Sequence, residues 1–403
     1  MQPHQTPLAG LRVIEVGQMI AGPFAGRQLA DFGAEVIKIE APEQDDPMRR
    51  WGHDLYKDRG LWWPSLARNK KSISLDLRQP DGQALFRALA RQSDVIIENF
   101  RPGTLERWGL GPEELHALNR GLIIARVSGF GQTGPYAERA GFASVGEAMG
   151  GLRYVNGHPG DKPPRSGISL GDSLAAMTAV QGILMALVWR NGRGEGQGQV
   201  VDAAITEACF SLMEGALTEY ATLGIVRKPS GSALKNIAPS NVYRSKDGQW
   251  IVIAANADRI FERLCTAIGR PSLAADPRFS SHTARGENAD QIDAIIQDWS
   301  CGHTAQEIDE ILNRHGVVCG PIYSIADIFE DPHYRDRGMV LEVEDPELGK
   351  IAVPGIVPKL SRTPGAHLWT GPNAKGTHNA EIYQDLLGLD HERMRELSER
   401  GVI

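Results

Sequence analysis

Asp172 is the residue best suited by type and position to act as a nucleophile, in the segment P-R-S-G-I-S-L-G-D-S at 164–173. The apolar run 174–189 follows it and predicts a buried helix. A carboxylate at a helix start meets the positive end of the helix dipole and unpaired N–H groups, so it should stay ionised. Gly167 and Gly171 leave room for a bulky ligand beside the backbone. The alternative is a plain N-cap, since aspartate is a favoured capping residue.

Basic residues form a second group with chemical potential. Arg68, Lys70 and Lys71 lie just before a predicted strand, whereas Arg101 and Arg107 follow another. Ligands bind at the carboxyl ends of strands in open α/β sheets, where arginine and lysine suit a phosphorylated ligand. The alternative is a solvated basic face.

Other site types find little support in the sequence. The eleven histidines show no H-x-x-x-H or H-E-x-x-H spacing, so we expect no metal site. The lack of a G-x-S-x-G elbow disfavours a serine hydrolase. The four cysteines are far apart and form no C-x-x-C pair, which indicates reduced cytosolic thiols.

Composition restricts the class of protein. A chain of 403 residues suggests two domains, and its net charge of −7 argues against nucleic acid as the main partner. The N-terminal segment lacks the features of a signal peptide, and no uncharged run of about 18 apolar residues predicts a membrane span. We therefore expect a cytoplasmic protein that binds no membrane.

Alternating strand and helix patterns fill the first third of the chain and predict an α/β fold with a doubly wound, Rossmann-like parallel sheet. The first turn, G-Q-M-I-A-G-P-F-A-G, is not G-x-G-x-x-G, so a nicotinamide site is not expected although Glu40 has suggestive spacing. The predicted strands are 11–16, 35–39, 72–77, 94–98 and 122–127, and the predicted helices are 22–32, 80–91 and 112–118.

The remaining patterns predict a smaller α+β domain beside the large one. The predicted domain limits are 1–205 for the first part of the large domain, 206–240 for a linker helix and loop, 241–325 for the small domain and 326–403 for the C-terminal part of the large domain. The elements are a strand or helix start at 200–205, a long helix at 207–223, strands at 241–244 and 249–254, helices at 257–268, 289–300 and 304–315, a hairpin at 339–361 and a helical tail from His378.

Several motifs occur along nearly the whole chain, in the same order as in a known protein family. They include L-R-V-I-E-V followed by A-G-P at 11–23, D-F-G-A-E-V-I-K-I-E at 31–40, N-K-K-S-I-S-L-D-L at 69–77, D-V-I-I-E-N-F-R-P-G at 94–103, G-F-G-Q-T-G-P-Y at 129–136, G-E-A-M-G-G-L at 146–152, G-V-V-C-G-P-I at 316–322 and E-D-P-H-Y-R-D-R-G-M at 330–339. With these motifs the sequence resembles the class III CoA-transferases, the family of formyl-CoA transferase and carnitine CoA-transferase that also holds α-methylacyl-CoA racemase.

The resemblance implies a role for each matching position. Asp172 falls where the family has its nucleophilic aspartate, and backbone N–H groups near 171–173 or on a facing glycine loop would hold the oxyanion. CoA or acyl-CoA would be a substrate, with no tightly bound cofactor. The positions that match CoA-binding residues are Gln18, Met19, Ile20, Ala21, Leu75, Asp76, Leu77, Arg78, Asn99, Phe100, Arg101, Arg107 and Arg139.

Two departures from the family pattern bear on the reaction. Phe142 stands where the racemases have a basic histidine, and phenylalanine cannot take a proton. The segment Lys228–Lys235 is shorter than the glycine run that closes over the intermediate in formyl-CoA transferases, which leaves a lid role open.

The resemblance therefore predicts a CoA-transferase that moves CoA from an acyl-CoA, such as succinyl-CoA, to a small carboxylic acid through an aspartyl-CoA thioester. The expected acceptor is a dicarboxylic acid. Arg139 and Arg165 could pair with the distal carboxylate of the acid. Phe142 and Arg165 are the residues predicted to contact the substrate. The family also implies an interlocked homodimer. An acyl-CoA racemase or isomerase and a non-catalytic CoA-binding protein remain alternatives, and the sequence leaves the donor, the acceptor and the pathway open.

Overall fold

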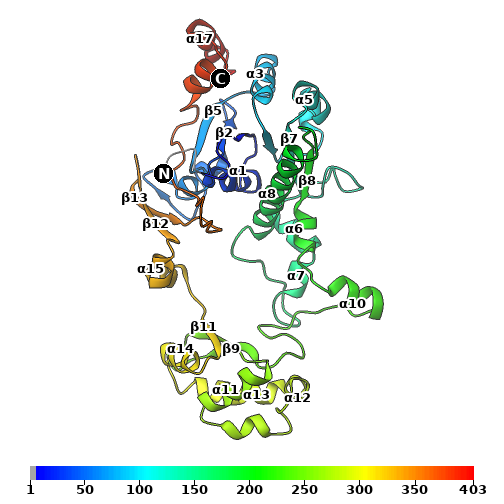
Figure 1. Ribbon diagram of the computed structural model, residues 1–403, viewed down its shortest axis with the longest axis vertical. Helices are drawn as coiled ribbons and strands as arrows, with labels where there is room; N and C mark the ends of the chain where they lie inside the picture. Colours follow the sequence, from blue (N-terminus) through cyan, green and yellow to red (C-terminus); the bar gives the residue numbers. More distant parts are fainter. Residues whose placement is uncertain (1–5) are drawn as a thin grey trace. The chain divides into compact units, whose positions relative to one another are not determined.

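The computed structural model describes residues 6–403, which divide into two compact units (Figure 1). The first unit runs to Leu152 and includes Ser166–Gly215 and His333–Ile403. The second consists of Arg153–Arg165 and Ala216–Pro332. The domain limits given above remain a prediction.

The first unit is built on a six-stranded sheet in the order β5-β2-β1-β6-β7-β8. All neighbouring strands are parallel, as the alternating pattern predicts. The chain winds outward from the centre in both directions, so the strand order reverses between β1 and β6. The strands are β1 Arg12–Glu15, β2 Glu35–Glu40, β5 Lys70–Ser74, β6 Val95–Glu98, β7 Ile123–Ser128 and β8 Val200–Ala204.

Helices cover both faces of this sheet, because alternate residues of each strand point to opposite sides. Val13 belongs to a hydrophobic cluster with helices α1 (Ala21–Asp31) and α8 (Leu170–Asn191). The next residue, Ile14, belongs to a second cluster with α3 (Pro80–Arg91) and α5 (Pro112–Leu118). The doubly wound α/β prediction is confirmed, and the layers can be followed in Figure 1.

Shorter elements complete the first unit, including the hairpin predicted at 339–361. Those on the chain before β8 are η2 Pro47–Arg49, β3 Leu55–Tyr56, β4 Arg59–Gly60, α2 Trp63–Leu66, α4 Thr104–Arg107, α6 Ala143–Met149 and α7 Leu152–Val155, which runs into the second unit. Those after it are α9 Ile205–Phe210, α16 Pro332–Asp336, β12 Val340–Asp345, β13 Gly349–Pro354, a π-helix Glu381–Leu386 and α17 His391–Glu399.

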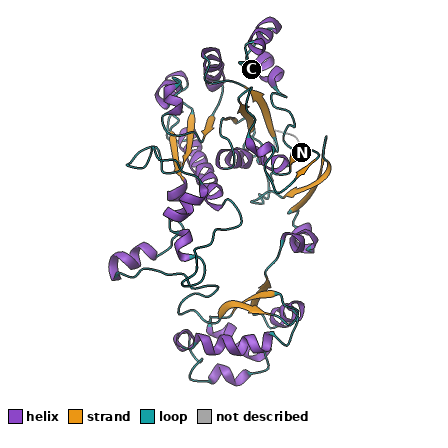
Figure 2. Ribbon diagram, turned by 180° about the vertical axis from the view of Figure 1, so that it is seen from behind, coloured by secondary structure: helices purple, strands orange, loops and turns teal. Residues whose placement is uncertain are grey.

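The second unit has a three-stranded antiparallel sheet, in the order β11-β10-β9, packed against helices (Figure 2). Ile251 and Ile253 of β10 share a core with Phe261 and Ile292 from the helices. The elements are β9 Ser240–Arg244, β10 Trp250–Ala254, β11 Val318–Pro321, α10 Ala216–Leu223, α11 Asp258–Ala267, η3 Pro271–Ala275, α12 His282–Glu287, α13 Ala289–Ser300, α14 Ala305–Arg314 and α15 Ile325–Glu330.

The predicted bounds of two elements are wrong. The helix predicted over 207–223 is broken into α9 and α10, because Glu214 has a positive φ of 50° that a helix cannot continue through. The strand predicted over 72–77 is β5, which ends at Ser74. Leu75 and the two residues after it are therefore loop.

The third error concerns α8, which the sequence predicts as a buried helix. Ala176 and Ile183 on one side pack into the core, but Met185 and Val188 on the other are 68% and 76% exposed. α8 is long and apolar enough to span a membrane by length and composition, yet this is weak evidence because a helix packed on a sheet meets the same test.

Candidate active site

The topology marks one edge of the sheet as the place for a ligand. In open α/β sheets ligands bind beyond the carboxyl ends of the strands where the strand order reverses, here after β1 and β6. The two loops at this point are tied together. The backbone N–H of Gln18 donates to Asn99 Oδ1 at 2.9 Å, and Asn99 Nδ2 donates to the Gln18 carbonyl at 2.9 Å. The structure thus brings together two of the segments predicted to bind CoA.

Buried charges hold the rest of the loop that follows β1. Lys38 Nζ donates to the Gly17 carbonyl at 2.7 Å, and Lys70 Nζ donates to the Pro23 carbonyl at 2.6 Å. Met19, which has a left-handed φ of 66°, donates its backbone N–H to Asp46 Oδ1 at 3.2 Å. The irregular backbone of 17–23 is therefore fixed by side chains from other elements.

These side chains form one ion-pair network inside the protein. Lys38 pairs with Glu15 at 3.2 Å and with Asp46 at 2.8 Å, while Lys70 pairs with Glu15 at 2.7 Å. Burial alone would lower the pKa of Lys38, but the carboxylates of Asp46 and Glu15 raise it above its ordinary value. Lys38 thus stays charged, as its contacts require.

Glu40 belongs to the same region and is not a ribose ligand. Its carboxylate pairs with Arg49 at 2.7 Å and accepts the backbone N–H of Asp46 at 3.0 Å. Burial would raise the pKa of Glu40, but Arg49 and Lys38 lower it to about 2. The acid is occupied in holding the loop after β2.

The prediction of a phosphate site at Arg68, Lys70 and Lys71 is wrong. Arg68 and Lys70 are fully buried, and Arg68 pairs with Asp31 at 2.6 Å. Lys71 pairs with Glu35 at 2.5 Å. These residues lie at the amino end of β5, away from the ligand edge, so their charges are used within the fold.

The segment Leu75–Arg78 is positioned mainly by internal contacts. Leu75 and Leu77 are buried in the core, while the Asp76 carboxylate accepts hydrogen bonds from Arg78 at 2.8 and 2.9 Å. The Asp76 backbone N–H donates to the Val402 carbonyl. Of the four, only the Arg78 side chain is largely exposed. Contact of this segment with CoA remains a prediction.

The basic residues after β6 lie at the ligand edge. Arg101 and Arg107 are exposed, and Arg107 donates to Thr104 Oγ1 at 2.9 Å. Phe100 packs edge-on against Trp108 with ring centroids 5.5 Å apart. Their surroundings leave both guanidinium groups accessible, and phosphate binding by them remains a prediction.

Asp172 lies in the first turn of α8, three residues after the N-cap Ser169. The plain N-cap alternative is therefore wrong. At the other end of α8, Arg190 donates to the Gly121 carbonyl, which precedes β7. The helix thus runs antiparallel to the strands and places Asp172 at their carboxyl edge. Ala175 shares a hydrophobic cluster with Ala21, which brings the helix of Asp172 beside the loop of Gln18.

Glycines allow α6, α8 and α9 to pack closely around Asp172, and we call these three helices the nucleophile corner, after the role predicted for Asp172. A Cβ on Gly171 would lie 3.1 Å from the Ala143 carbonyl oxygen of α6, and one on Gly150 would lie 2.6 Å from Cys209 Cβ of α9. The contact at Gly150 is too short for a methyl group and the one at Gly171 is tight, so a side chain at Gly150 would force α6 and α9 apart.

Glu147 of α6 is the residue that sequence reasoning missed. It is only 2% exposed, and its Oε1 accepts the backbone N–H of Gly171 at 3.2 Å. Its one sequence signal is an acid inside the small, apolar segment G-E-A-M-G-G-L. The backbone N–H of Ser173 donates to the Ser169 carbonyl. The N–H groups of Gly171 and Ser173, predicted to hold an oxyanion, are therefore already engaged.

The nearby thiol is a poor rival nucleophile. Burial raises the pKa of Cys209 to about 11, and the carboxylates of Glu147 and Asp172 add to this effect. Burial and Asp309 raise the pKa of Cys319 to about 12. Thiolates, which are the reactive form, would be scarce at neutral pH. No cluster of potential metal ligands occurs among residues 6–403.

The residues predicted to contact the substrate differ in their exposure and in their neighbours. Phe142 is the N-cap of α6, 64% exposed, and directly precedes the Ala143 that packs on Gly171. Arg139 is exposed, with its guanidinium 3.6 Å from the Tyr136 ring centroid. Arg165 and Lys228–Lys235 belong to the second unit, and their roles remain predictions.

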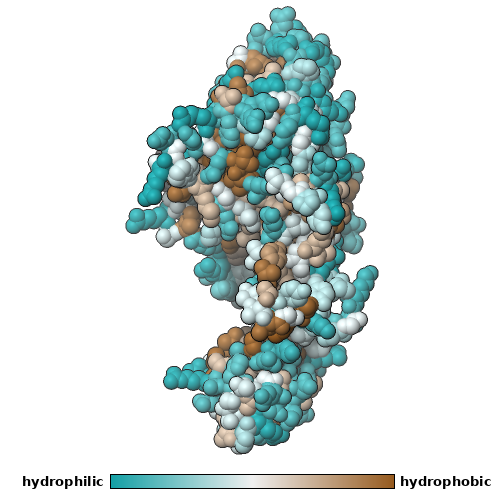
Figure 3. Space-filling view, turned by 90° about the vertical axis from the view of Figure 1, so that its right-hand side faces the viewer, coloured by the Kyte–Doolittle hydropathy of each residue, from teal (hydrophilic) through white to brown (hydrophobic). Residues whose placement is uncertain are grey.

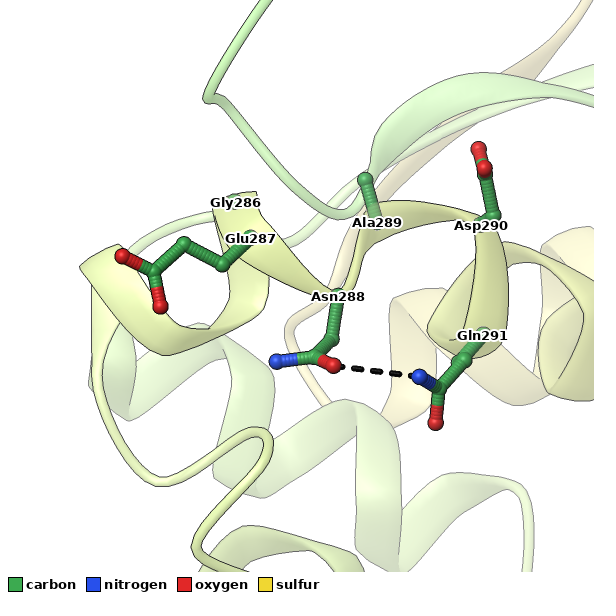
Figure 4. Close-up of a pocket in the computed structure, with 6 residues that line it drawn as sticks. All are labelled: Gly286, Glu287, Asn288, Ala289, Asp290 and Gln291. Carbon is green, nitrogen blue, oxygen red and sulfur yellow. Dashed lines mark hydrogen bonds between the residues drawn. The ribbon is translucent and has the colours of Figure 1, made fainter.

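A shallow depression of about 360 Å³ lies in the second unit at the turn between α12 and α13 (Figure 4). There Gln291 Nε2 donates to Asn288 Oδ1 at 3.1 Å. Its charged side chains are the acids Glu287 and Asp290, which would repel the phosphates of CoA. We place the candidate site at the carboxyl edge of the large sheet instead.

Comparisons with known proteins agree with this geometry. Residues 8–379 match the sequence profile of CoA-transferase family III. The chain is 54% identical, over 98% of both chains, to succinyl-CoA–D-citramalate CoA-transferase of Chloroflexus aurantiacus. It is 30% identical to human succinyl-CoA:glutarate CoA-transferase, over 98% of this chain and 90% of that one.

A solved structure of a CaiB/BaiF family protein from Brucella suis superimposes with a TM-score of 0.83 at 33% identity. The superposition covers 95% of this chain and 100% of that one. The family resemblance seen in the motifs is thus confirmed at the level of both sequence and fold, and the chain belongs to CoA-transferase family III.

Proposed function

We propose that this transferase moves CoA from succinyl-CoA to a small dicarboxylic acid through a thioester on Asp172. The observation that carries the proposal is the position of Asp172 in the first turn of α8, at the sheet edge where the strand order reverses. The named activities of the relatives, which act on citramalate and glutarate, support the choice of substrates.

The reaction has four displacement steps. The Asp172 carboxylate attacks the thioester carbonyl carbon, the C–S bond breaks, and CoA leaves as a thiolate to give an aspartyl–acyl anhydride. The thiolate attacks Cγ of Asp172, and the donor acid leaves as a carboxylate. The acceptor carboxylate then attacks the aspartyl-CoA thioester, which releases the thiolate again. Attack of that thiolate on the new acyl group yields the product acyl-CoA and restores Asp172.

No proton or electron is consumed, so the protein needs no acid–base pair or redox group for the net transfer. Carboxylates are weak nucleophiles in water, and positioning must supply much of the rate. Converting a bimolecular encounter into a local one can lower the barrier by up to ~7–11 kcal/mol. The packed nucleophile corner provides such positioning.

Binding of CoA is assigned to the loops at the same edge. The exposed guanidinium groups of Arg101 and Arg107 would contact its phosphates, and the loop of Gln18–Ala21 would line the thioester. A distal carboxylate, once removed from water, needs a cationic or hydrogen-bonding partner. Arg139 and Arg165 are assigned to that role.

A racemase or isomerase is the second candidate within the family. That reaction needs a base at the position that Phe142 occupies. Phe142 directly precedes Ala143, the residue that packs on Gly171. An exposed phenylalanine cannot exchange an α-proton, so transfer is favoured over racemisation. A non-catalytic CoA-binding protein would have no need of Asp172.

We also propose that the protein acts as a homodimer in the cytoplasm. Apolar side chains are exposed at the surface, among them Met185 and Val188 of α8 and Leu217 and Leu223 of α10. Apolar residues at the surface are visible as brown areas in Figure 3. A second copy of the chain would cover such residues, and sedimentation of the purified protein measures its mass.

The decisive test combines trapping with substitution. Incubation with succinyl-CoA alone, followed by hydroxylamine or borohydride, should modify the peptide that holds Asp172. Asp172→Asn keeps the shape and removes the charge, so transfer should fall by at least ~10³-fold while CoA still binds. Asp161→Asn, at an exposed position, is the matched control. Wild-type turnover by Asp172→Asn, with deamidation excluded by mass, would refute the mechanism.

The acceptor is identified by a screen of matched mono- and dicarboxylic acids of four and five carbons. New CoA esters of the dicarboxylic acids are expected. Preference for butyrate over succinate and its five-carbon relatives would contradict the substrate assignment, and α-proton exchange without transfer would favour the racemase.

A further inference from the structure

We propose that Glu147 is a positioning residue for Asp172, whose hydrogen bond to the Gly171 backbone fixes the peptide unit that carries the nucleophile. This inference rests on the proposed function of Asp172. It adds a residue of α6, outside the helix that bears the nucleophile, to the machinery of the reaction.

The N-cap residue of α8 does not cap the helix with its side chain. Ser169 and Asp172 have the spacing of a capping box, in which the serine side chain would accept an N–H from the first turn. The Ser169 side chain makes no such bond. The Gly171 N–H, which a helix leaves without an internal partner, is bonded instead to Glu147 Oε1 at 3.2 Å. The cap is thus supplied by another helix.

Packing fixes Glu147 opposite this turn. Ala143 and Glu147 are four residues apart on α6 and share one face of that helix. The same face meets Gly171, where a Cβ would lie 3.1 Å from the Ala143 carbonyl oxygen and 3.0 Å from Ile205 Cγ2 of α9. Because α6 approaches this turn so closely, the carboxylate of Glu147 lies directly opposite the first turn of α8.

The burial of Glu147 indicates that its hydrogen bond to Gly171 has a functional role. Glu147 is only 2% exposed, and a carboxylate is expensive to bury unless it accepts hydrogen bonds. Its hydrogen bond to Gly171 ends on the residue immediately before Asp172, which points to a role in positioning that residue.

Asp172 must form and break several bonds in succession during the proposed reaction. Its carboxyl carbon is attacked and released repeatedly while CoA and the two acids exchange around it. A first turn anchored at Gly171 keeps that carbon in line with its partners at each step. Loosening the anchor should therefore lower kcat and leave the KM for acyl-CoA largely unchanged.

Two conservative variants separate the hydrogen bond from the charge. Glu147→Gln keeps a carbonyl oxygen at the same reach without the charge, whereas Glu147→Asp keeps the charge and withdraws it by one methylene. We expect kcat of Glu147→Gln within ~3-fold of wild type and kcat of Glu147→Asp lowered by ~10-fold or more, with KM for succinyl-CoA within ~2-fold in both. Glu113→Asp, an exposed acid on α5, is the matched control.

The single-turnover rate at which the trapped aspartyl-CoA forms, measured per folded active site, should follow kcat. It should be close to wild type in Glu147→Gln and lower in Glu147→Asp. Wild-type kcat in Glu147→Asp, an equal loss in both variants, or failure of Glu147→Asp to fold would each overturn the proposal. The last outcome would make Glu147 structural. If the wild-type protein forms no adduct on Asp172, the proposed function itself fails, so the two failures are distinguishable.

Discussion

The two regions that meet at the ligand edge are held in place by different physical means. The loop 17–23 after β1 is fixed by a buried network of opposite charges, with Lys38 and Lys70 donating to its carbonyls. The nucleophile corner is fixed by close contact of small residues, and within it Glu147 bonds the backbone at Gly171.

The backbone of each region explains the difference. The loop is irregular, with Met19 at a left-handed φ, so its N–H and carbonyl groups find no partners within a helix or strand. Side chains must supply those partners. In the corner the helices satisfy most of their own backbone, and N–H groups of their first turns bond to neighbouring elements, as Gly171 does to Glu147 and Thr206 does to the Gly129 carbonyl.

Each region should therefore be sensitive to a different kind of change. The loop depends on charge, because removing one ion leaves its partners buried without compensation. The corner depends on volume, because glycines set the distance between helices. Substitutions and pH can test this contrast.

Removal of Lys38 should have the largest effect on stability. Lys38→Met leaves the buried carboxylates of Glu15 and Asp46 with Lys70 as the remaining cation of the network, and the free energy of unfolding should fall by about 3–5 kcal/mol. Urea titration followed by circular dichroism measures the change.

The matched control is Lys350→Met, which removes a lysine paired with Glu342 on the exposed hairpin. Little change is expected there, because exposed ion pairs contribute little. An equally small effect of Lys38→Met would mean that the network does not stabilise the loop.

Acid should weaken the charge network through Glu40. Its pKa, lowered to about 2 by Arg49 and Lys38 against the effect of burial, lies below that of the unfolded chain, near 4.3. The native state therefore binds fewer protons, and its advantage is present above pH ~4.3 and lost as pH falls toward 2. The loss is roughly 3 kcal/mol for this group.

Unfolding measured between pH 5 and 2 should show this slope in the wild-type protein and a flatter one in Glu40→Gln. Glu43→Gln, an exposed neighbour in the chain, should keep the wild-type slope. An identical acid dependence in wild type and Glu40→Gln would show that Glu40 is not the linked group.

Periodicity was enough to predict most of the fold. The apolar, β-branched runs gave β1, β2, β6 and β7 to within two residues, and proline at the first turn marked the starts of α3 and α5. These signals are local. The break at Glu214 depends on a left-handed residue that is not glycine, and its one signal in the pattern of 207–223 is the neighbouring Gly215.

The site was harder to predict, because its supporting residues act across the sheet. Lys38 and Lys70 sit in strands, where lysine normally marks an exposed face, and their partners lie on other strands and loops. Asp172 stood out because a glycine and an apolar helix flank it. Glu147 did not, since its target is a backbone N–H from a helix 24 positions further along the chain.

The smallest of these effects should come from adding one methyl group to the nucleophile corner. A Cβ at Gly150 would lie 2.6 Å from Cys209 Cβ and 2.7 Å from the Thr206 carbonyl oxygen, so Gly150→Ala must push α6 away from α9. Overpacking of this kind costs about 1–3 kcal/mol, and kcat should fall with it because Glu147 moves with α6. Gly167→Ala is the matched control, since open space surrounds that position. The stability of Gly167→Ala should be unchanged. A stable Gly150→Ala with wild-type kcat would show that the corner tolerates volume, and the contrast with the charge-held loop would then fail.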